Sequence, residues 1–186
     1  KTERMLYKNA ALTANEETQV KGYVERLLQH EPVQYVLNES WFCGFKFYVD
    51  KNVLIPRPET EELVEWVITD CKFPINELKI LDIGSGSGCI PISLKRKLRK
   101  AEIWSCDISE EALQVAKKNT VTLGTTVDFL QLDFLDSEQW QQLPSFDVIV
   151  SNPPYIPEKD AAAMHPNVLK YEPSTALFVP DNDPLV

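Results

Sequence analysis

The sequence predicts an α/β protein with a doubly wound, Rossmann-like parallel sheet. Short apolar runs alternate with helical stretches from residue 79 to residue 150, as strands and crossover helices do in such sheets. A glycine-rich turn at residues 84–88 follows the first apolar run, and polar residues follow the later ones. Ligands of open α/β sheets bind just past the carboxyl ends of the strands, so these polar positions form the candidate functional site.

Four apolar runs are expected to form the strands of this sheet, with helices before and between them. The first helix follows Pro58 and carries glutamates in its first turn, where negative charge suits the helix dipole. The next begins at Cys89, and another is opened by Ser109 and closed by Gly124. The predicted strands span residues 79–83, 102–107, 127–132 and 146–151.

The first 56 residues predict two smaller units. Residues 3–30 show helical spacing with few breakers, so residues 1–30 are expected to be the end of a small helical domain. Residues 31–56 alternate aromatic and polar groups around Gly44, which is typical of a β-hairpin, here linking that domain to a sheet domain at residues 57–186. The apolar residues of the helical part, interpreted as core or docking positions, are Met5, Leu6, Val20, Val24, Leu27 and Leu28.

The glycine-rich turn indicates a nucleotide-type pocket without the two common phosphate-binding patterns. Gly84, Gly86 and Gly88 would let a ligand approach the backbone closely, with helix N–H groups pointing at it. The third glycine comes one residue early for a dinucleotide fingerprint, and the Gly-Lys-Ser/Thr ending of a P-loop is missing. Asp82, before the turn, could accept a hydrogen bond from a ligand ammonium group, which S-adenosylmethionine has and NAD lacks.

Two later strand ends carry groups suited to the rest of such a cofactor. Asp107 ends the second predicted strand and is suited to grip the two ribose hydroxyls. After the third strand, the carboxylate of Asp133 could accept a hydrogen from an adenine amino group, and the Phe134 ring could stack on the base. The alternatives are that Asp107 caps the helix starting near Ser109 and that Asp133 is a turn residue.

The turn after the fourth strand, Asn152-Pro153-Pro154-Tyr155, indicates how a planar nitrogen group could be held for methylation. Such a nitrogen is a poor nucleophile, because its lone pair is delocalised. The site must therefore accept hydrogen bonds from its N–H groups and aim the lone pair at the incoming carbon. The Asn152 side-chain oxygen and the Pro153 carbonyl could both accept, and neither proline has a competing N–H. Tyr155 could pack on the flat group. The alternative is an ordinary proline-rich turn with Tyr155 as a core anchor.

Composition narrows the classes of partner. The net charge of −9 argues against a nucleic-acid substrate, which normally needs a basic surface. The one basic run, residues 95–100, is explained by cations near a helix C-terminus, with a partner or RNA contact as the alternative.

The cysteines and histidines predict no metal site. The four cysteines include no Cys-x-x-Cys pair, no histidine stands at ligand spacing, and both histidines, His30 and His165, are isolated in sequence. No signal peptide and no apolar run of membrane length is found, so a protein of the reducing cytoplasm without membrane contact is expected.

These motifs together resemble a known family. The order Asp-Ile-Gly-Ser-Gly-Ser-Gly, Cys-Asp, Asp-Phe and Asn-Pro-Pro-Tyr is similar to class I S-adenosylmethionine-dependent methyltransferases that act on nitrogen. Across residues 30–180, the segments that resemble the HemK/PrmC family of release-factor glutamine methyltransferases are residues 31–35, 45–49, 53–61, 171–173 and 176–178. Asn38 and residues 179–182 depart from the glycines expected in that family.

The resemblance implies a reaction and roles for individual residues. Methyl transfer from S-adenosylmethionine to the glutamine amide of a Gly-Gly-Gln motif in a peptide chain release factor would leave S-adenosylhomocysteine. The helical segment would position the protein substrate. In the family's reaction, Asn152 and Pro153 would orient the amide. From the residues themselves, Asn152 is also expected beside the cofactor, and Pro154, Tyr155 and Arg57 on the substrate side. Arg57 is equally consistent with a structural ion pair.

Other interpretations stay open on the residues alone. An adenine-amino methyltransferase acting on DNA or RNA would share the Asn-Pro-Pro-Tyr turn, and a non-catalytic cofactor-binding module would share the glycine turn. The family's sheet has seven strands, whereas four are predicted here, so the C-terminal strands are expected to be missing from a fragment. A sheet of four strands would then present an open hydrophobic edge, for further sequence or a partner to cover.

Overall fold

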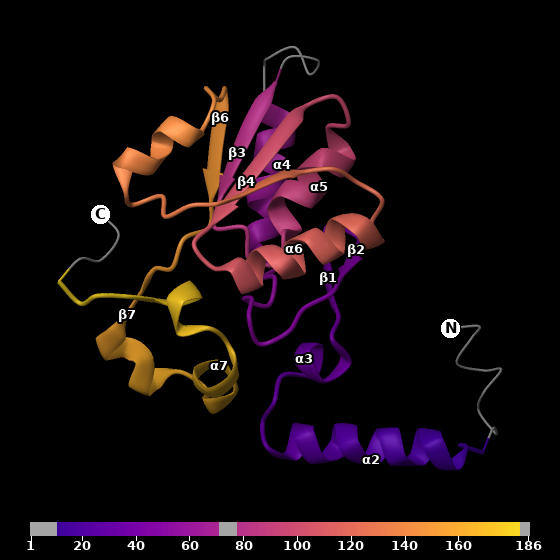
Figure 1. The fold of residues 1–186 in the computed structure, drawn as a ribbon. Coiled ribbons are helices and arrows are strands. Elements are labelled where there is room, and N and C mark those ends of the chain that lie inside the picture. Colours follow the sequence, from indigo (N-terminus) through magenta and orange to yellow (C-terminus); the bar gives the residue numbers. More distant parts are fainter. Residues whose placement is uncertain (1–10, 71–77, 183–186) are drawn as a thin grey trace.

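The computed structural model describes residues 11–70 and 78–182, and its centre is a four-stranded parallel sheet (Figure 1). The strand order is β5-β4-β3-β6, and the four predicted strands are confirmed, two of them with narrower bounds. The chain moves outward from β3 through β4 to β5 and then returns to pair β6 on the other side of β3. The strands are β3 (Lys79–Ile83), β4 (Glu102–Asp107), β5 (Asp128–Gln131) and β6 (Val148–Ser151).

The order of strands therefore reverses between β3 and β6, which in open α/β sheets marks the ligand crevice. The register places Ile83 opposite Cys106 on one side and Ser151 on the other. All four strands are parallel, so the turns that follow them meet at one edge of the sheet.

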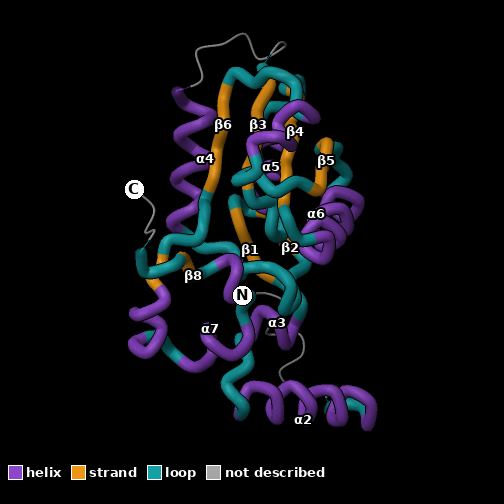
Figure 2. The backbone as a smooth tube through the Cα atoms, turned by 60° about the vertical axis from the view of Figure 1, so that its left-hand side comes forward, coloured by secondary structure: helices purple, strands orange, loops and turns teal. Residues whose placement is uncertain are grey.

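Alternate residues of β3 serve two different layers, as the twofold strand period requires. Ile80 belongs to a core cluster with Val64 of α4 (Glu59–Asp70) and Ile92 of α5 (Cys89–Lys97). Leu81 faces a second cluster, closed by the loop that contains the 3₁₀ helix η1 (Ser137–Gln142). Figure 2 shows α4 alongside β6, with α5 and α6 (Glu110–Thr122) toward β4 and β5.

The predicted helix at the amino end is α2 (Ala14–Leu28), opened by a capping box between Thr13 and Glu16. It lies apart from the sheet (Figure 1) and contains no buried residue. Arg26 fastens its end by donating to Glu31 and to the carbonyls of Tyr35 and Val36. Four of the six residues interpreted as core or docking positions lie in the described ranges. They are exposed, so they are not core residues here: Val20, Val24, Leu27 and Leu28. The other two, Met5 and Leu6, lie outside the described residues.

The linker is a helix followed by a hairpin, and not a hairpin throughout. α3 (Val33–Leu37) precedes the antiparallel pair β1 (Ser40–Phe42) and β2 (Phe45–Phe47), which turns at Cys43-Gly44. The prediction of strand structure was wrong for residues 33–37. Asn38 does not belong to a hairpin turn; it ends α3 in the left-handed conformation (φ 54°), which asparagine tolerates better than most residues.

The segment after β6 folds into a small unit of its own (Figure 1). Its two short strands pair in parallel, Ile156 opposite Phe178, so the turn at residues 152–155 is held at its carboxyl end. The elements that follow β6 are β7 (Ile156–Pro157), η2 (Glu158–Ala163), α7 (Pro166–Tyr171), η3 (Ser174–Ala176) and β8 (Phe178–Val179).

None of the helices in the described ranges has the length and apolar character that would take it across a membrane.

Candidate active site

The glycine turn after β3 needs glycine for conformation and for packing. Gly84, Gly86 and Gly88 have φ values of 84°, 50° and 77°, in the left-handed region that side chains disfavour. A Cβ at Gly88 would lie 2.9 Å from Ile92 Cδ1 and 3.1 Å from Ala116 Cβ, so the third glycine lets α5 and α6 approach each other.

The N–H groups of this turn serve the protein itself. Gly84 and Ser85 donate to the Cys106 carbonyl, Gly86 donates to the Asp107 carboxylate, and Gly88 donates to the Ser85 carbonyl. These four amides precede α5, which begins at Cys89, so the expectation that helix N–H groups point at the ligand stays a prediction. A turn whose amides are already bonded suits a ligand without phosphates better than a dinucleotide.

Asp82, in β3 directly below the turn, is a completely buried carboxyl group. Its Oδ2 accepts a hydrogen bond from the Ser105 hydroxyl at 2.6 Å, while Oδ1 has no partner. Burial, with a further contribution from the nearby charge of Asp107, raises the pKa of Asp82 to about 8. A buried oxygen without a partner is costly, so the site is built to receive a hydrogen-bond donor or a cation.

Asp107 organises the edge of the sheet at the end of β4. Its Oδ2 accepts from Gly86 N at 2.9 Å and its Oδ1 accepts from Ser109 N at 2.9 Å. The N-cap of α6 is Ser109, whose hydroxyl accepts from Ala112 N, so the alternative that Asp107 itself caps the helix is wrong. The carboxylate is only partly buried and has acceptor capacity left for a ligand.

After β5, the turn at Asp133 and Phe134 leads into η1. Asp133 Oδ1 accepts from Leu135 N at 3.0 Å, which is the turn geometry that its alternative interpretation expected. The Phe134 ring is stacked on Trp140, with centroids 5.3 Å apart, and the Trp140 indole donates to the Phe134 carbonyl at 2.9 Å. Sequence reasoning missed Trp140, whose position in a short polar helix gives no periodic signal.

The Asn152-Pro153-Pro154-Tyr155 turn stands at the β6 end of the same edge, where the strand order reverses. Asn152 Nδ2 donates to Thr60 Oγ1 of α4 at 3.1 Å. Tyr155 is 67% exposed, so the interpretation of this residue as a core anchor is wrong. Pro153 is exposed and Pro154 half-buried.

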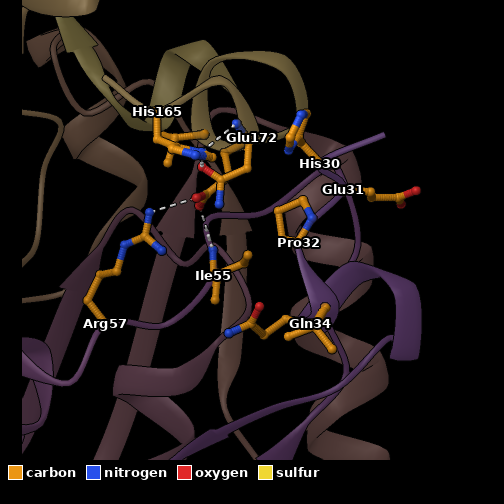
Figure 3. Close-up of a pocket in the computed structure, with 11 residues that line it drawn as sticks. His30, Glu31, Pro32, Gln34, Ile55, Arg57, His165 and Glu172 are labelled. Atoms are coloured by element: carbon orange, nitrogen blue, oxygen red, sulfur yellow. Dashed lines mark hydrogen bonds and ion pairs between the residues drawn. The ribbon is translucent and has the colours of Figure 1, made fainter. Parts of the chain in front are cut away.

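Arg57 forms the ion pair that one interpretation expected. Its guanidinium lies 2.7 Å from Oε1 of Glu172, whose side chain is 2% exposed. The other carboxylate oxygen of Glu172 accepts from Ile55 N at 3.1 Å (Figure 3). These contacts join the segment before α4 to the end of α7.

Beside this ion pair lies a polar cavity of about 330 Å³. His30 and His165, isolated in the sequence, both line it, with their rings edge to face and their centroids 6.1 Å apart. Figure 3 shows both histidines in the upper part of the view, with Gln34 below them and Arg57 at the lower left.

Asn119 of α6 is a second residue that sequence reasoning missed. It is fully buried, and its side chain donates to the carbonyls of Ser87 and Tyr48 and accepts from Tyr48 N, at 2.7–2.9 Å. The side chain thus ties the glycine turn to the chain leaving the hairpin. An asparagine inside an amphipathic helix carries no sequence signal for such a contact.

The basic run behaves as helix-end cations do. Lys95 donates to the Ala101 carbonyl and Arg96 to the Leu123 carbonyl, so two of its charges serve backbone near helix ends. Within the two described stretches, no group of three or more histidine, cysteine or acidic side chains is placed to hold a metal ion.

Comparison with known proteins places this site in a family. The model of the methyltransferase small domain matches residues 62–170, and that of the PrmC N-terminal domain matches residues 1–37. A release factor glutamine methyltransferase of Flavobacterium psychrophilum is 49% identical over 87% of this chain and 56% of its own length. One of Bacteroides thetaiotaomicron is 44% identical over 96% of this chain and 63% of its own. The chain therefore spans less than two thirds of these relatives.

A solved structure supports the fold independently. An S-adenosylmethionine-dependent methyltransferase of Agrobacterium tumefaciens superposes with a TM-score of 0.52 at 20% identity, over 62% of this chain and 39% of that one. The Rossmann-like prediction and the resemblance to the HemK/PrmC family are both confirmed. With a glycine turn, strand-end carboxylates and an Asn-Pro-Pro-Tyr turn at one sheet edge, the chain belongs to the methyltransferase small-domain family, and its amino-terminal segment is of the PrmC type.

Proposed function

We propose that this protein transfers a methyl group from S-adenosylmethionine to the side-chain amide nitrogen of the glutamine in a Gly-Gly-Gln motif of a peptide chain release factor. The observation that carries the proposal is the Asn152 side chain, held at the strand-order reversal with its N–H on Thr60 and its oxygen left to accept. The names of the similar proteins, release factor glutamine methyltransferases, support the choice of substrate.

The residues at the sheet edge fit the cofactor. Oδ1 of Asp82 has no hydrogen-bond partner and suits the ammonium group of the cofactor. The backbone N–H groups of Gly84, Gly86 and Gly88 already donate within the protein, which is compatible with a ligand that has no phosphates. Asp107 would hold the ribose hydroxyls, and Asp133 and Phe134 the adenine, with Asn152 beside the reacting group.

Positioning is the main task of the protein in this reaction. When bound, S-adenosylmethionine supplies an electrophilic methyl on a positively charged sulfur. Asn152 Oδ1 and the Pro153 carbonyl would accept the two amide N–H groups of glutamine, and Tyr155 would pack on the amide plane. The nitrogen–carbon bond forms as the sulfur–carbon bond breaks, and the methylated nitrogen then loses a proton to water, so no strong base is required.

The remaining chain would guide the protein substrate. Residues 1–30 would belong to a substrate-positioning helical domain, residues 31–56 to the linker, and residues 57–186 to the methyltransferase domain. The exposed apolar residues of α2 and the polar cavity beside Arg57 are the candidate contacts for the protein substrate. Arg57 would contact the substrate with the guanidinium donors that Glu172 does not use.

The decisive experiment offers both kinds of acceptor at once. The full-length protein would be incubated with methyl-labelled S-adenosylmethionine, a purified release factor and an adenine-containing oligonucleotide, and mass spectrometry would locate the label. Label on the Gly-Gly-Gln glutamine is expected. Label on adenine, or no transfer despite cofactor binding, would contradict the proposal.

Two variants separate the amide site from the cofactor site. Asn152→Ala should reduce kcat at least about 100-fold, the range for losing one preorganised transition-state contact, and leave cofactor affinity intact. Asp107→Ala should weaken cofactor binding first. Calorimetric titration with S-adenosylhomocysteine measures the cofactor affinity of both variants. A loss of cofactor affinity in Asn152→Ala equal to that in Asp107→Ala would refute the assignment of Asn152 to the amide site.

A further inference from the structure

We infer that Thr60 is a positioning residue that anchors the Asn152 side chain at the place from which methyl transfer requires it to act. The inference rests on the proposed function, because it assigns Asn152 the task of accepting the substrate amide. It starts from one contact between segments 92 residues apart, in which Asn152 Nδ2 donates to Thr60 Oγ1 at 3.1 Å. Thr60 is 8% exposed and Asn152 is half-buried, so this is a partly buried polar contact.

The location of Thr60 explains why its hydroxyl is directed to Asn152. Thr60 stands in the first turn of α4, where no carbonyl of that helix lies four residues before it. Thr69, farther along α4, shows the usual arrangement, since its hydroxyl donates to the Glu65 carbonyl at 2.9 Å. The backbone of Thr60 is held by its own N–H, which donates to the Arg57 carbonyl at 3.1 Å.

The contact matters because a primary amide has an acceptor at one end and a donor at the other. The substrate glutamine presents N–H groups, so it needs Oδ1 of Asn152. Rotation of the Asn152 amide by half a turn would exchange Oδ1 and Nδ2, so that the Nδ2 donor would face the N–H donors of the substrate. A threonine hydroxyl can also donate, so the substrate selects the productive orientation. Thr60 provides the partner that keeps the half-buried Asn152 amide in place.

The test is a set of substitutions on α4 in the full-length protein. In Thr60→Val, which keeps the shape and removes the hydroxyl, kcat for release-factor methylation should fall about 10- to 100-fold, as the loss of the partner of one half-buried donor predicts. Affinity for S-adenosylhomocysteine should stay at the wild-type value. Thr60→Ser should restore most of kcat, and Thr69→Val, the matched control on the same helix, should leave kcat unchanged.

Three results would overturn the inference: a wild-type kcat in Thr60→Val, a Ser variant as slow as the Val variant, or a parallel loss of cofactor affinity. A readout independent of turnover is the pair of side-chain N–H signals of Asn152 in nitrogen-15 NMR, identified by their loss in Asn152→Ala. These signals should shift and exchange faster with water in Thr60→Val. Unchanged signals would refute the Thr60 contact, whereas absence of transfer by the wild type would refute the proposed function instead.

Discussion

Asp82 combines burial, charge and an unsatisfied oxygen in one residue. Its pKa is raised to about 8, so in the ligand-free protein the carboxyl group is mostly protonated at neutral pH. A cationic ligand ammonium would favour the carboxylate. Cofactor binding is therefore expected to release a proton from the protein.

This linkage predicts a pH dependence of cofactor binding with a definite sign. Between about pH 6 and 7.5, affinity for S-adenosylmethionine should rise with pH, since removing the Asp82 proton costs less as the pH approaches its pKa. At about pH 7.7 to 8 the α-amino group of the ligand has lost about half of its own charge, and the gain should end. Calorimetry in buffers of different ionisation enthalpy measures the proton release.

The control is Asp82→Asn, which should bind more weakly and lose the proton release between pH 6 and 7.5. Stability provides a second check, because a carboxyl pKa raised above 3.8 on folding costs stability as the pH rises toward about 8. The wild-type protein without cofactor should therefore lose stability over this range, and the Asn variant should lose less. Binding without proton exchange would contradict the assignment.

At the scale of elements, single buried side chains join segments that are distant in the sequence. Asn119 connects α6 to the glycine turn and to the chain leaving β2, with every polar atom of its amide bonded. The geometry of the glycine turn thus depends on a residue 32 positions farther along the chain. Glu172 likewise joins the end of α7 to the segment before α4, because its carboxylate accepts hydrogen bonds from Ile55 N and Arg57.

Asn119→Ala should lower the free energy of unfolding by about 2–3 kcal/mol, because it leaves backbone groups of Ser87 and Tyr48 without partners. Urea denaturation followed by circular dichroism measures the change. The matched control, Gln114→Ala, alters an exposed position of the same helix and should change stability by less than about 0.5 kcal/mol. Equal effects of the two variants would show that the Asn119 contacts contribute little.

Glu172→Ala should cost about 2–4 kcal/mol, since it leaves Ile55 N unsatisfied and removes the partner of Arg57 from a mostly buried pair. Glu172→Gln keeps an acceptor and should cost less. The surface pair of Lys46 and Glu39 is the comparison, and Glu39→Ala should fall within about 1 kcal/mol of wild type. A chemical denaturation series on the three variants tests this order.

At the scale of the whole molecule, charge separates the classes of substrate. A net charge of −9 disfavours the approach of polyanions, and Lys95 and Arg96 of the basic run donate to backbone carbonyls. An adenine-containing duplex should therefore neither bind measurably at physiological salt nor inhibit release-factor methylation. Fluorescence anisotropy of a labelled oligonucleotide measures binding, and a dissociation constant below about 1 μM, tighter than ordinary non-specific binding, would restore the nucleic-acid alternative.

The sequence by itself determined the four strands of the sheet, the glycine turn and the position of the Asn-Pro-Pro-Tyr turn. These features follow from local patterns: apolar runs form strands, glycine permits left-handed backbone, and residues just past parallel strands share an edge. The linker helix at residues 33–37 escaped prediction because five residues hold little periodic signal, and tertiary packing of Tyr35 and Val36 decides their conformation.

Only the tertiary structure decided which side chains meet across long sequence distances. Thr60 on Asn152, Asn119 on the glycine turn and Glu172 on Arg57 are contacts between residues 92, 32 and 115 positions apart. Such polar partners carry no periodicity of their own. Their pairing is set by the packing of helices on the sheet, which brings buried donors to buried acceptors because an unpaired polar group inside the protein is costly.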